Sequence, residues 1–267
     1  MLSVLSPPRV AAQARLLAAI THGEDGTYFD ALRTIQRRFP MGSHGNDCPR
    51  LLFDLDEIAQ SFLTCVLAES QLPLLPIGRL SPILESRARE LVFEALQLLE
   101  SYDPEMPTNV RQLIGTLLFA QVEGCAGGSS IDALGTVWVS PRDEWTAVRY
   151  AECLCHELVH QALFLEDMLF PIFQNTAEEP MIVSSIRRCK RPYEFSFHSA
   201  VVTGALIEMY VAMGLQTLAE EFFEGLSASV VAFEAMPQHL TTRGLEILDE
   251  LSQIISSCNR SASHLLE

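Results

Sequence analysis

Residues 153–165, CLCHELVHQALFL, are the most informative stretch of this 267-residue chain. Almost every side chain in the stretch is apolar, and its polar members are His156, Glu157, His160 and Gln161. An apolar run without proline or glycine predicts an α-helix, which we expect to begin after Pro141 and to end near Leu169. Because a helix that is apolar on all sides is buried, this one is predicted to lie at the centre of the fold.

The pentapeptide HELVH (residues 156–160) matches the H-E-x-x-H pattern of metal-binding helices. Histidines four residues apart project from one helix face, so the imidazoles of His156 and His160 can reach the same ion. Chance would produce about 0.02 such matches in a chain of this composition, so the motif is a specific signal. Buried ionisable side chains are costly unless they are satisfied. A metal satisfies them, and the competing interpretation is a pair of core histidines bonded to backbone.

A third ligand must come from elsewhere, because protein metal sites use at least three side chains. The metzincin continuation would need glycine and histidine where this chain has Leu163 and Glu166. His198, in the apolar segment EFSFHSAVVTGALIEMYVAMG, is the stronger candidate. Glu178 or Glu179 are the alternatives, although they lie in a proline-bounded stretch without helical pattern.

The remaining histidines and the cysteines beside the motif are not expected to bind the metal. We expect surface positions for His22, His44, His239 and His264. We expect Cys153 and Cys155, which stand among apolar residues, to be core side chains.

A basic cluster, RRCKR (residues 187–191), precedes His198. We expect Arg187, Arg188 and Lys190 to lie in a solvated loop. Arg191, followed by Pro192, is the member expected to point inward. A guanidinium beside a metal is suited to bidentate capture of a carboxylate.

The rest of the chain predicts a mainly α fold with a small β element. The helices are expected at about 9–20, 28–38, 51–71, 83–102, 107–122, 194–214 and 240–257, with a loop at 40–49. The segment GTVWVS (residues 135–140) predicts a strand, because it is short, β-branched and aromatic. We expect one domain, 1–267, in which the central HExxH helix packs against a second buried helix. Its N-terminal helical half covers about 1–125 and its metal-site half about 126–267.

Composition excludes several classes of protein. A net charge of −16 disfavours nucleic-acid binding, since phosphates would be repelled. No uninterrupted apolar run reaches the roughly 18 residues that a membrane span needs. The N-terminal MLSVLSPPRV lacks a basic region, and the seven cysteines are odd in number and scattered. Together these features predict a cytoplasmic protein that is not membrane-bound.

Three segments resemble the HExxH-type iron- and α-ketoglutarate-dependent peptide β-hydroxylases that modify ribosomally made peptide natural products. They are GTVWVS followed by AECLCHELVHQALFLEDMLFP, then RPYEFSFHSAVVTGALIEMY, and finally LTTRGLEILDEL. They occur in that order over roughly the last half of the chain. The HExxH piece is shared with zinc peptidases, and the Arg-Pro-x5-His block separates the two groups.

The resemblance implies Fe(II), α-ketoglutarate and O2, and hydroxylation of a β-carbon in a precursor peptide. It implies iron binding by His156, His160 and His198 and co-substrate binding by Arg191. The common non-haem arrangement is two histidines and one carboxylate, from which a third histidine departs. A hydroxylase has no evident need for Glu157 as a base.

Two other functions compete with the hydroxylase. One is a zinc metallopeptidase, in which Glu157 is the general base beside a zinc-bound water. The other is a non-catalytic helical binding module that retains the motif. We expect the peptide substrate to add as an extra strand along residues 135–140, because an exposed strand edge beside a metal-binding helix can dock a peptide. The alternative is that this strand is internal to a small sheet and fully paired.

Overall fold

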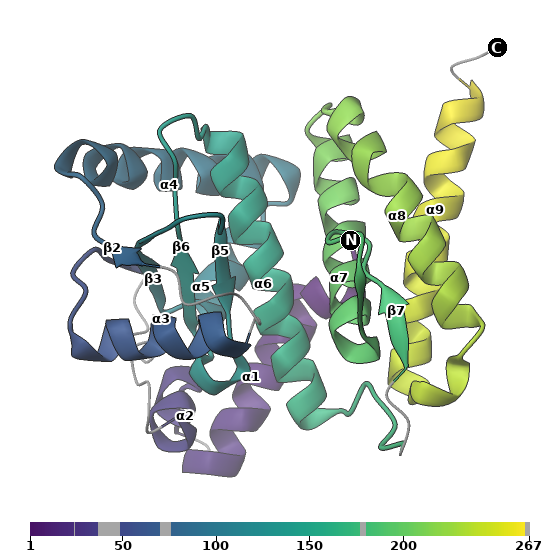
Figure 1. Ribbon diagram of the computed structural model, residues 1–267. Coiled ribbons are helices and arrows are strands. Elements are labelled where there is room, and N and C mark those ends of the chain that lie inside the picture. Colours follow the sequence, from purple (N-terminus) through teal and green to yellow (C-terminus); the bar gives the residue numbers. More distant parts are fainter. Residues whose placement is uncertain (24, 37–48, 70–75, 177–179, 265–267) are drawn as a thin grey trace. The chain divides into compact units, whose positions relative to one another are not determined.

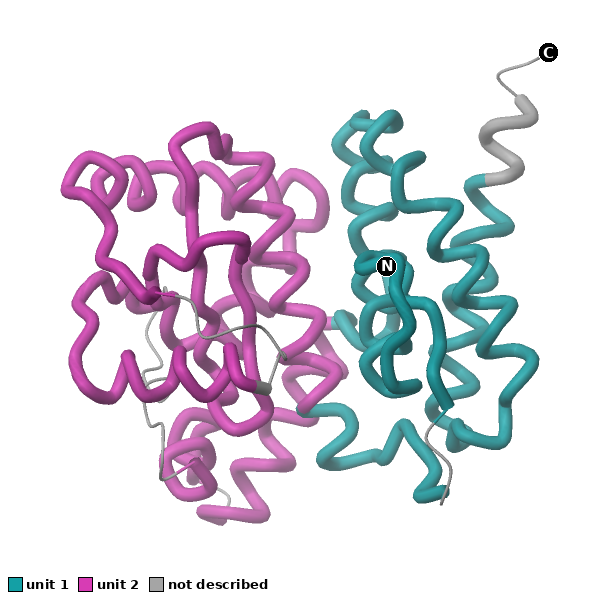
Figure 2. Tube along the Cα trace, viewed as in Figure 1, with its two compact units in different colours: residues 1–6, 165–267 teal, residues 7–164 magenta. Residues whose placement is uncertain are grey.

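The computed structural model describes residues 1–23, 25–36, 49–69, 76–176 and 180–264. This part of the chain is mainly helical with small sheets, as the sequence predicts. It divides into two compact units, which Figure 2 colours separately. The sheet unit comprises residues 7–164, and the helical unit comprises residues 1–6 and 165–267. The prediction of a single domain stays a prediction.

The sheet unit surrounds short strands with helices (Figure 1). Its helices are α1 (Pro7–His22), α2 (Tyr28–Ile35), α3 (Glu57–Glu69), α4 (Pro82–Tyr102), α5 (Met106–Leu113) and α6 (Ala147–Leu169), whose last residues enter the helical unit. Its strands are β1 (Arg50–Leu52), β2 (Ile77–Gly78), β3 (Thr116–Phe119), β4 (Gln121–Val122), β5 (Gly127–Ser129) and β6 (Thr136–Val139). Local signals define several helix starts: Thr27 and Asp30 form a capping box on α2, and Ser81 caps α4.

The main sheet has the strand order β1-β3-β6-β5. Strands β1, β3 and β6 are parallel, and β5 is antiparallel to β6. The predicted strand at 135–140 is confirmed as β6, but the expectation that it is an exposed edge is wrong. It is buried along its length and paired on both sides, and the edge beside it is β5.

Helices cover both faces of this sheet. Trp138 of β6 packs in a cluster with Phe62 and Leu63 of α3. Ser129 of β5 lies opposite Val137 in the register, and its hydroxyl bonds to α6. Since adjacent residues of a strand point to opposite faces, α3 and α6 lie on opposite sides of the sheet.

Two predicted helices of the sheet unit need correction. The predicted helix at 51–71 begins only at Glu57, because Arg50–Leu52 forms β1. The predicted helix at 107–122 ends at Leu113, and the apolar run after it forms β3, whose four residues are all buried. A short apolar run is compatible with either a buried helix or a strand buried on both faces. The loop expected at 40–49 lies almost wholly outside the described residues.

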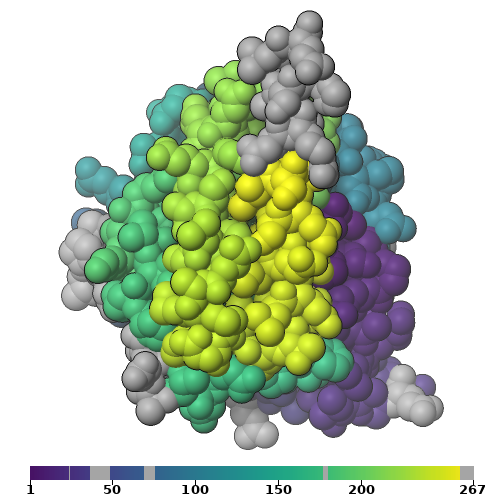
Figure 3. Space-filling model, turned by 90° about the vertical axis from the view of Figure 1, so that its right-hand side faces the viewer, coloured from purple at the N-terminus to yellow at the C-terminus, as the bar shows by residue number. Residues whose placement is uncertain are grey.

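The helical unit packs three helices against one another: α7 (Tyr193–Ala212), α8 (Gln216–Glu234) and α9 (Thr242–His264). Figure 3 shows α8 and α9 side by side. An antiparallel hairpin, β7 (Met181–Val183) and β8 (Lys190–Pro192), contacts α7 and α8. The sequence analysis predicted α7 and α9 but assigned no helix to the segment that forms α8.

Helix α7 also bears on the membrane prediction. Among the described residues it alone is long and apolar enough to cross a bilayer, although 78% of the qualifying window is buried inside the structure. Its sequence contains no uninterrupted apolar run of the length predicted for a membrane span, because Glu194 and Glu208 interrupt it. This degree of burial is typical of the core helix of a soluble protein.

Candidate functional site

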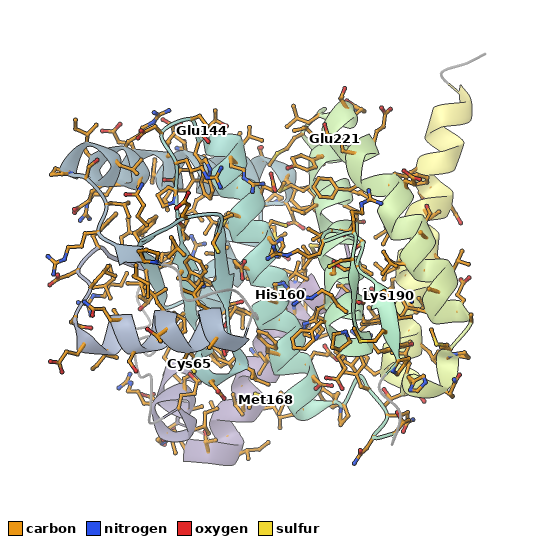
Figure 4. The ribbon with its side chains drawn as sticks, in the orientation of Figure 1. Cys65, Glu144, His160, Met168, Lys190 and Glu221 are labelled. Carbon is orange, nitrogen blue, oxygen red and sulfur yellow. The ribbon has the colours of Figure 1, made fainter. Side chains whose placement is uncertain are left out.

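Helix α6 brings His156 and His160 together. Their ring centroids lie 5.0 Å apart with the rings tilted by 58°. Both side chains are half-buried, and Figure 4 labels His160 on α6. The helical spacing therefore does what the motif predicts: it places two imidazoles on one face, one turn apart.

Two other α6 side chains anchor the helix to the sheet. Glu157 accepts a hydrogen bond from the Ser129 hydroxyl of β5 at 2.8 Å. Gln161, fully buried, accepts one from the Gly135 backbone N–H at 2.7 Å. Being four residues apart, Glu157 and Gln161 form a sheet-facing stripe. His156 and His160 each precede a member of that stripe by one residue and so lie about 100° around the helix from it.

Glu157 is the most constrained group of the motif. It is 4% exposed, one carboxylate oxygen is held by Ser129, and the other lies 3.8 Å from His156 Nε2. The sequence analysis did not identify Ser129. Its only local signal was its place in the glycine- and serine-rich break before β6, because a hydrogen bond across 28 residues depends on the sheet register.

The flanking cysteines belong to the core, as predicted. Cys153 and Cys155 are both buried, and neither forms a disulfide. Burial, followed by the nearby charge of Glu157, raises the pKa of the Cys153 thiol to about 12. Cys153 therefore stays protonated at neutral pH, whereas metal ligation requires the thiolate.

His198 lies on α7 in the helical unit. It is 9% exposed, and its ring stacks on Phe173 with centroids 6.0 Å apart. His156 and His160 belong to the sheet unit, so convergence of the three histidines stays a prediction. Within the described residues, no three His, Cys, Asp or Glu side chains form a metal-binding group. The alternative ligands Glu178 and Glu179 lie outside the described part of the chain.

Arg191 occupies β8 directly opposite Ile182 of β7. Opposed residues of an antiparallel pair point to the same face, so Arg191 shares the face of Ile182, which is 3% exposed. Its guanidinium lies over the Phe195 ring at 5.2 Å. Burial, and then the charge of Arg187, lowers the pKa of Arg191. Among the described residues, no carboxylate forms an ion pair with it.

The other histidines divide into two groups. His22 is exposed, as predicted, and its Nε2 lies 2.7 Å from the Asp30 carbonyl. The expectation for His239 is wrong: it is 7% exposed, and its Nδ1 lies 3.0 Å from the Thr176 hydroxyl. Its polar sequence neighbours concealed this burial. His44 and the side chain of His264 lie outside the described residues.

Comparison with known proteins adds no assignment. No protein-family model matches the chain, and no curated protein matches it.

Proposed function

We propose that this protein is an iron- and α-ketoglutarate-dependent oxygenase that hydroxylates a β-carbon of a residue in a ribosomally made precursor peptide. The observation that carries the proposal is the pairing of His156 and His160 on one half-buried face of α6. Two imidazoles at this spacing fit two positions around Fe(II). In the proposed site, His198 supplies the third imidazole.

Arg191 favours an oxygenase over a peptidase. α-Ketoglutarate has two carboxylates, and the one remote from the metal needs a cation in a pocket of low polarity. Arg191 is partly desolvated, shares the face of buried Ile182 and lacks an acidic partner among the described residues. A peptidase needs no cation reserved for a small dicarboxylate. When iron, O2 and the co-substrate are bound, the products are succinate, CO2 and a peptide with C–OH in place of C–H.

The chain's own residues then have distinct roles. His156, His160 and His198 would hold the metal, and Arg191 would orient the co-substrate. Ser129 fixes the Glu157 carboxylate against the sheet, so that Glu157 supports the fold of the site. We propose that the reaction takes place in the reducing cytoplasm, a compartment that suits cysteines which, among the described residues, form no disulfide. Nucleic acid and membrane are not among the proposed partners.

The second candidate is a zinc metallopeptidase with Glu157 as general base. The observation that favours it is the position of Glu157 Oε1, which lies 3.8 Å from His156 Nε2. A base there would be close to a metal-bound water.

Mass spectrometry of the precursor peptide separates the two functions. Incubated with Fe(II), α-ketoglutarate and air, the peptide should gain the mass of one oxygen atom, with succinate formed in equal amount. We expect Arg191→Ala to raise the KM for α-ketoglutarate about tenfold or more, because a charge-assisted pair is lost. Glu157→Gln should retain part of the hydroxylation. Cleavage that requires zinc, ignores α-ketoglutarate and is abolished by Glu157→Gln would establish the peptidase instead.

Metal content tests the ligands separately. We expect His156→Ala, His160→Ala and His198→Ala each to lower the bound iron per chain. His22→Ala, at an exposed histidine, is the matched control and should leave it unchanged. If His198→Ala retains full iron, the third ligand is another residue.

A further inference from the structure

The β7–β8 hairpin concentrates positive charge in a strongly acidic chain. Lys190 is the only lysine in the sequence, and Arg187, Arg188, Lys190 and Arg191 are the only lysines or arginines between Arg149 and Arg243. The chain as a whole carries −16. Ion pairs within the described residues involve none of the four. We call residues 181–192 the basic hairpin.

The turn of the basic hairpin is held rigidly. Arg188 has a left-handed backbone (φ 53°), and its guanidinium donates to the Glu221 carbonyl of α8 at 3.3 Å. Gly225 makes room for that guanidinium, since a Cβ there would lie 2.7 Å from Nη1. Arg188 is therefore a structural cation that attaches the turn to α8.

Buried hydroxyl groups fasten the same turn to α7. Ser184 and Ser185 hydroxyls lie 2.8 and 3.0 Å from the Ser199 hydroxyl, and Ser185 also lies 2.7 Å from that of Thr203. A hydroxyl network inside the protein is costly unless all its members are satisfied, and here it orders a surface turn. The exposed side chains of Arg187 and Lys190 therefore extend from a backbone that these hydrogen bonds hold in place.

The outer face of the basic hairpin is both cationic and apolar. Val183 lies opposite Lys190, and Met181 lies opposite Pro192, so these four side chains share the face turned away from buried Ile182. Met181 and Val183 are 52% and 49% exposed, and Lys190 is exposed beside them (Figure 4). Exposed apolar side chains beside unpaired cations are typical of a binding surface.

We infer that the outer face of the basic hairpin binds an acidic, extended segment of the precursor peptide, with Arg187 and Lys190 pairing with its carboxylates and Met181 and Val183 contacting its apolar side chains. This inference rests on the proposed function only in taking a precursor peptide as the partner. Charge complementarity selects the occupant: the chain as a whole is strongly acidic, so an acidic segment is attracted to the cations gathered on this face. Arg191, turned to the other face, stays available for the co-substrate.

Fluorescence anisotropy tests the inference with the full chain and no metal or co-substrate. The probe is a short fluorescein-labelled peptide that alternates Glu with Leu, and its control replaces Glu by Gln. We expect the Glu peptide to bind more tightly and to lose affinity as salt is raised. Arg187→Glu and Lys190→Glu should each weaken binding about tenfold, and Lys190→Arg should preserve it. Arg15→Glu, which changes the net charge equally at an exposed site of the sheet unit, should have almost no effect.

The single lysine provides a second readout without any variant. The Glu peptide should protect Lys190 from acetic anhydride, whereas the Gln peptide should not. Equal effects of Lys190→Glu and Arg15→Glu, or equal binding of the two peptides, would overturn the inference. So would tighter binding of phosphatidylserine vesicles or duplex DNA at Lys190. Peptide binding without hydroxylation would refute the proposed function and support the peptide-binding surface. Hydroxylation without protection of Lys190 would support the proposed function and refute the peptide-binding surface.

Discussion

Arg243 offers a direct test of how the helical unit is held together. Its Nε donates to Glu166 Oε1 at 2.8 Å, and the Glu166 side chain is completely buried. Its Nη2 donates to the Ser3 hydroxyl at 2.9 Å, which joins the N-terminus to α9. The Arg243 side chain is only 11% exposed. Arg243→Met keeps most of the volume and removes the charge, so the buried Glu166 carboxylate loses its ion pair with Arg243.

The magnitude follows from that burial. Removing one partner of a buried ion pair costs roughly 3–5 kcal/mol. We expect about 3 kcal/mol, since water can reach the vacated arginine site. That corresponds to a fall in Tm of about 6–12 °C for a chain of this size. Urea unfolding followed by circular dichroism, together with calorimetry, measures both quantities.

An exposed pair of the same type is the control. Arg89 lies 2.7 Å from Glu85, with side chains 51% and 36% exposed, and Arg89→Met should cost less than about 0.5 kcal/mol. Combining Arg243→Met with Glu166→Leu should recover part of the loss, because the buried carboxylate that loses the Arg243 ion pair is then removed as well. Equal costs for the Arg243 and Arg89 variants would refute this account of the buried pair.

Further outcomes are expected at three residues, Gly225, Cys153 and Ser129. Gly225→Ala should destabilise the protein by about 1–3 kcal/mol, although alanine has the higher helix propensity. The reason is that the added Cβ would lie 2.6 Å from the Ser185 carbonyl oxygen. A gain in Tm would contradict this prediction. In the native protein, Cys153 should resist iodoacetamide up to about pH 12, because its thiol ionises only near its raised pKa. Exposed Cys189 should react first. Mass mapping that finds Cys153 labelled before Cys189 would contradict this prediction. The raised pKa of Cys153 also predicts a pH dependence of the free energy of unfolding. Its contribution to stability should be complete below about pH 9 and decline as the pH rises towards 12. Denaturant titrations at several pH values measure this change. Ser129→Ala should cost about 1–3 kcal/mol by removing the hydrogen bond to a buried carboxylate, and Ser129→Thr should retain part of it.

The sequence alone predicted those features that depend on local periodicity. The adjacency of His156 and His160 follows from helix geometry, as does the course of α6 through the apolar run. The breaks at proline and glycine likewise located most helices to within a few residues. These features depend on contacts between residues one or two turns apart, which any sequence with the same spacing would form.

Tertiary structure decided the rest, because the contacts concerned join residues far apart in the chain. Strand β6 is internal only because β5 and β3 pair on either side of it. Glu157 is held by Ser129, and Glu166 by Arg243 on another helix, at separations that no local pattern encodes. The apolar run that forms β3 (Thr116–Phe119) could be buried either as a helix or as a strand. Pairing with its neighbours selected the strand, since a buried backbone must have its hydrogen bonds made.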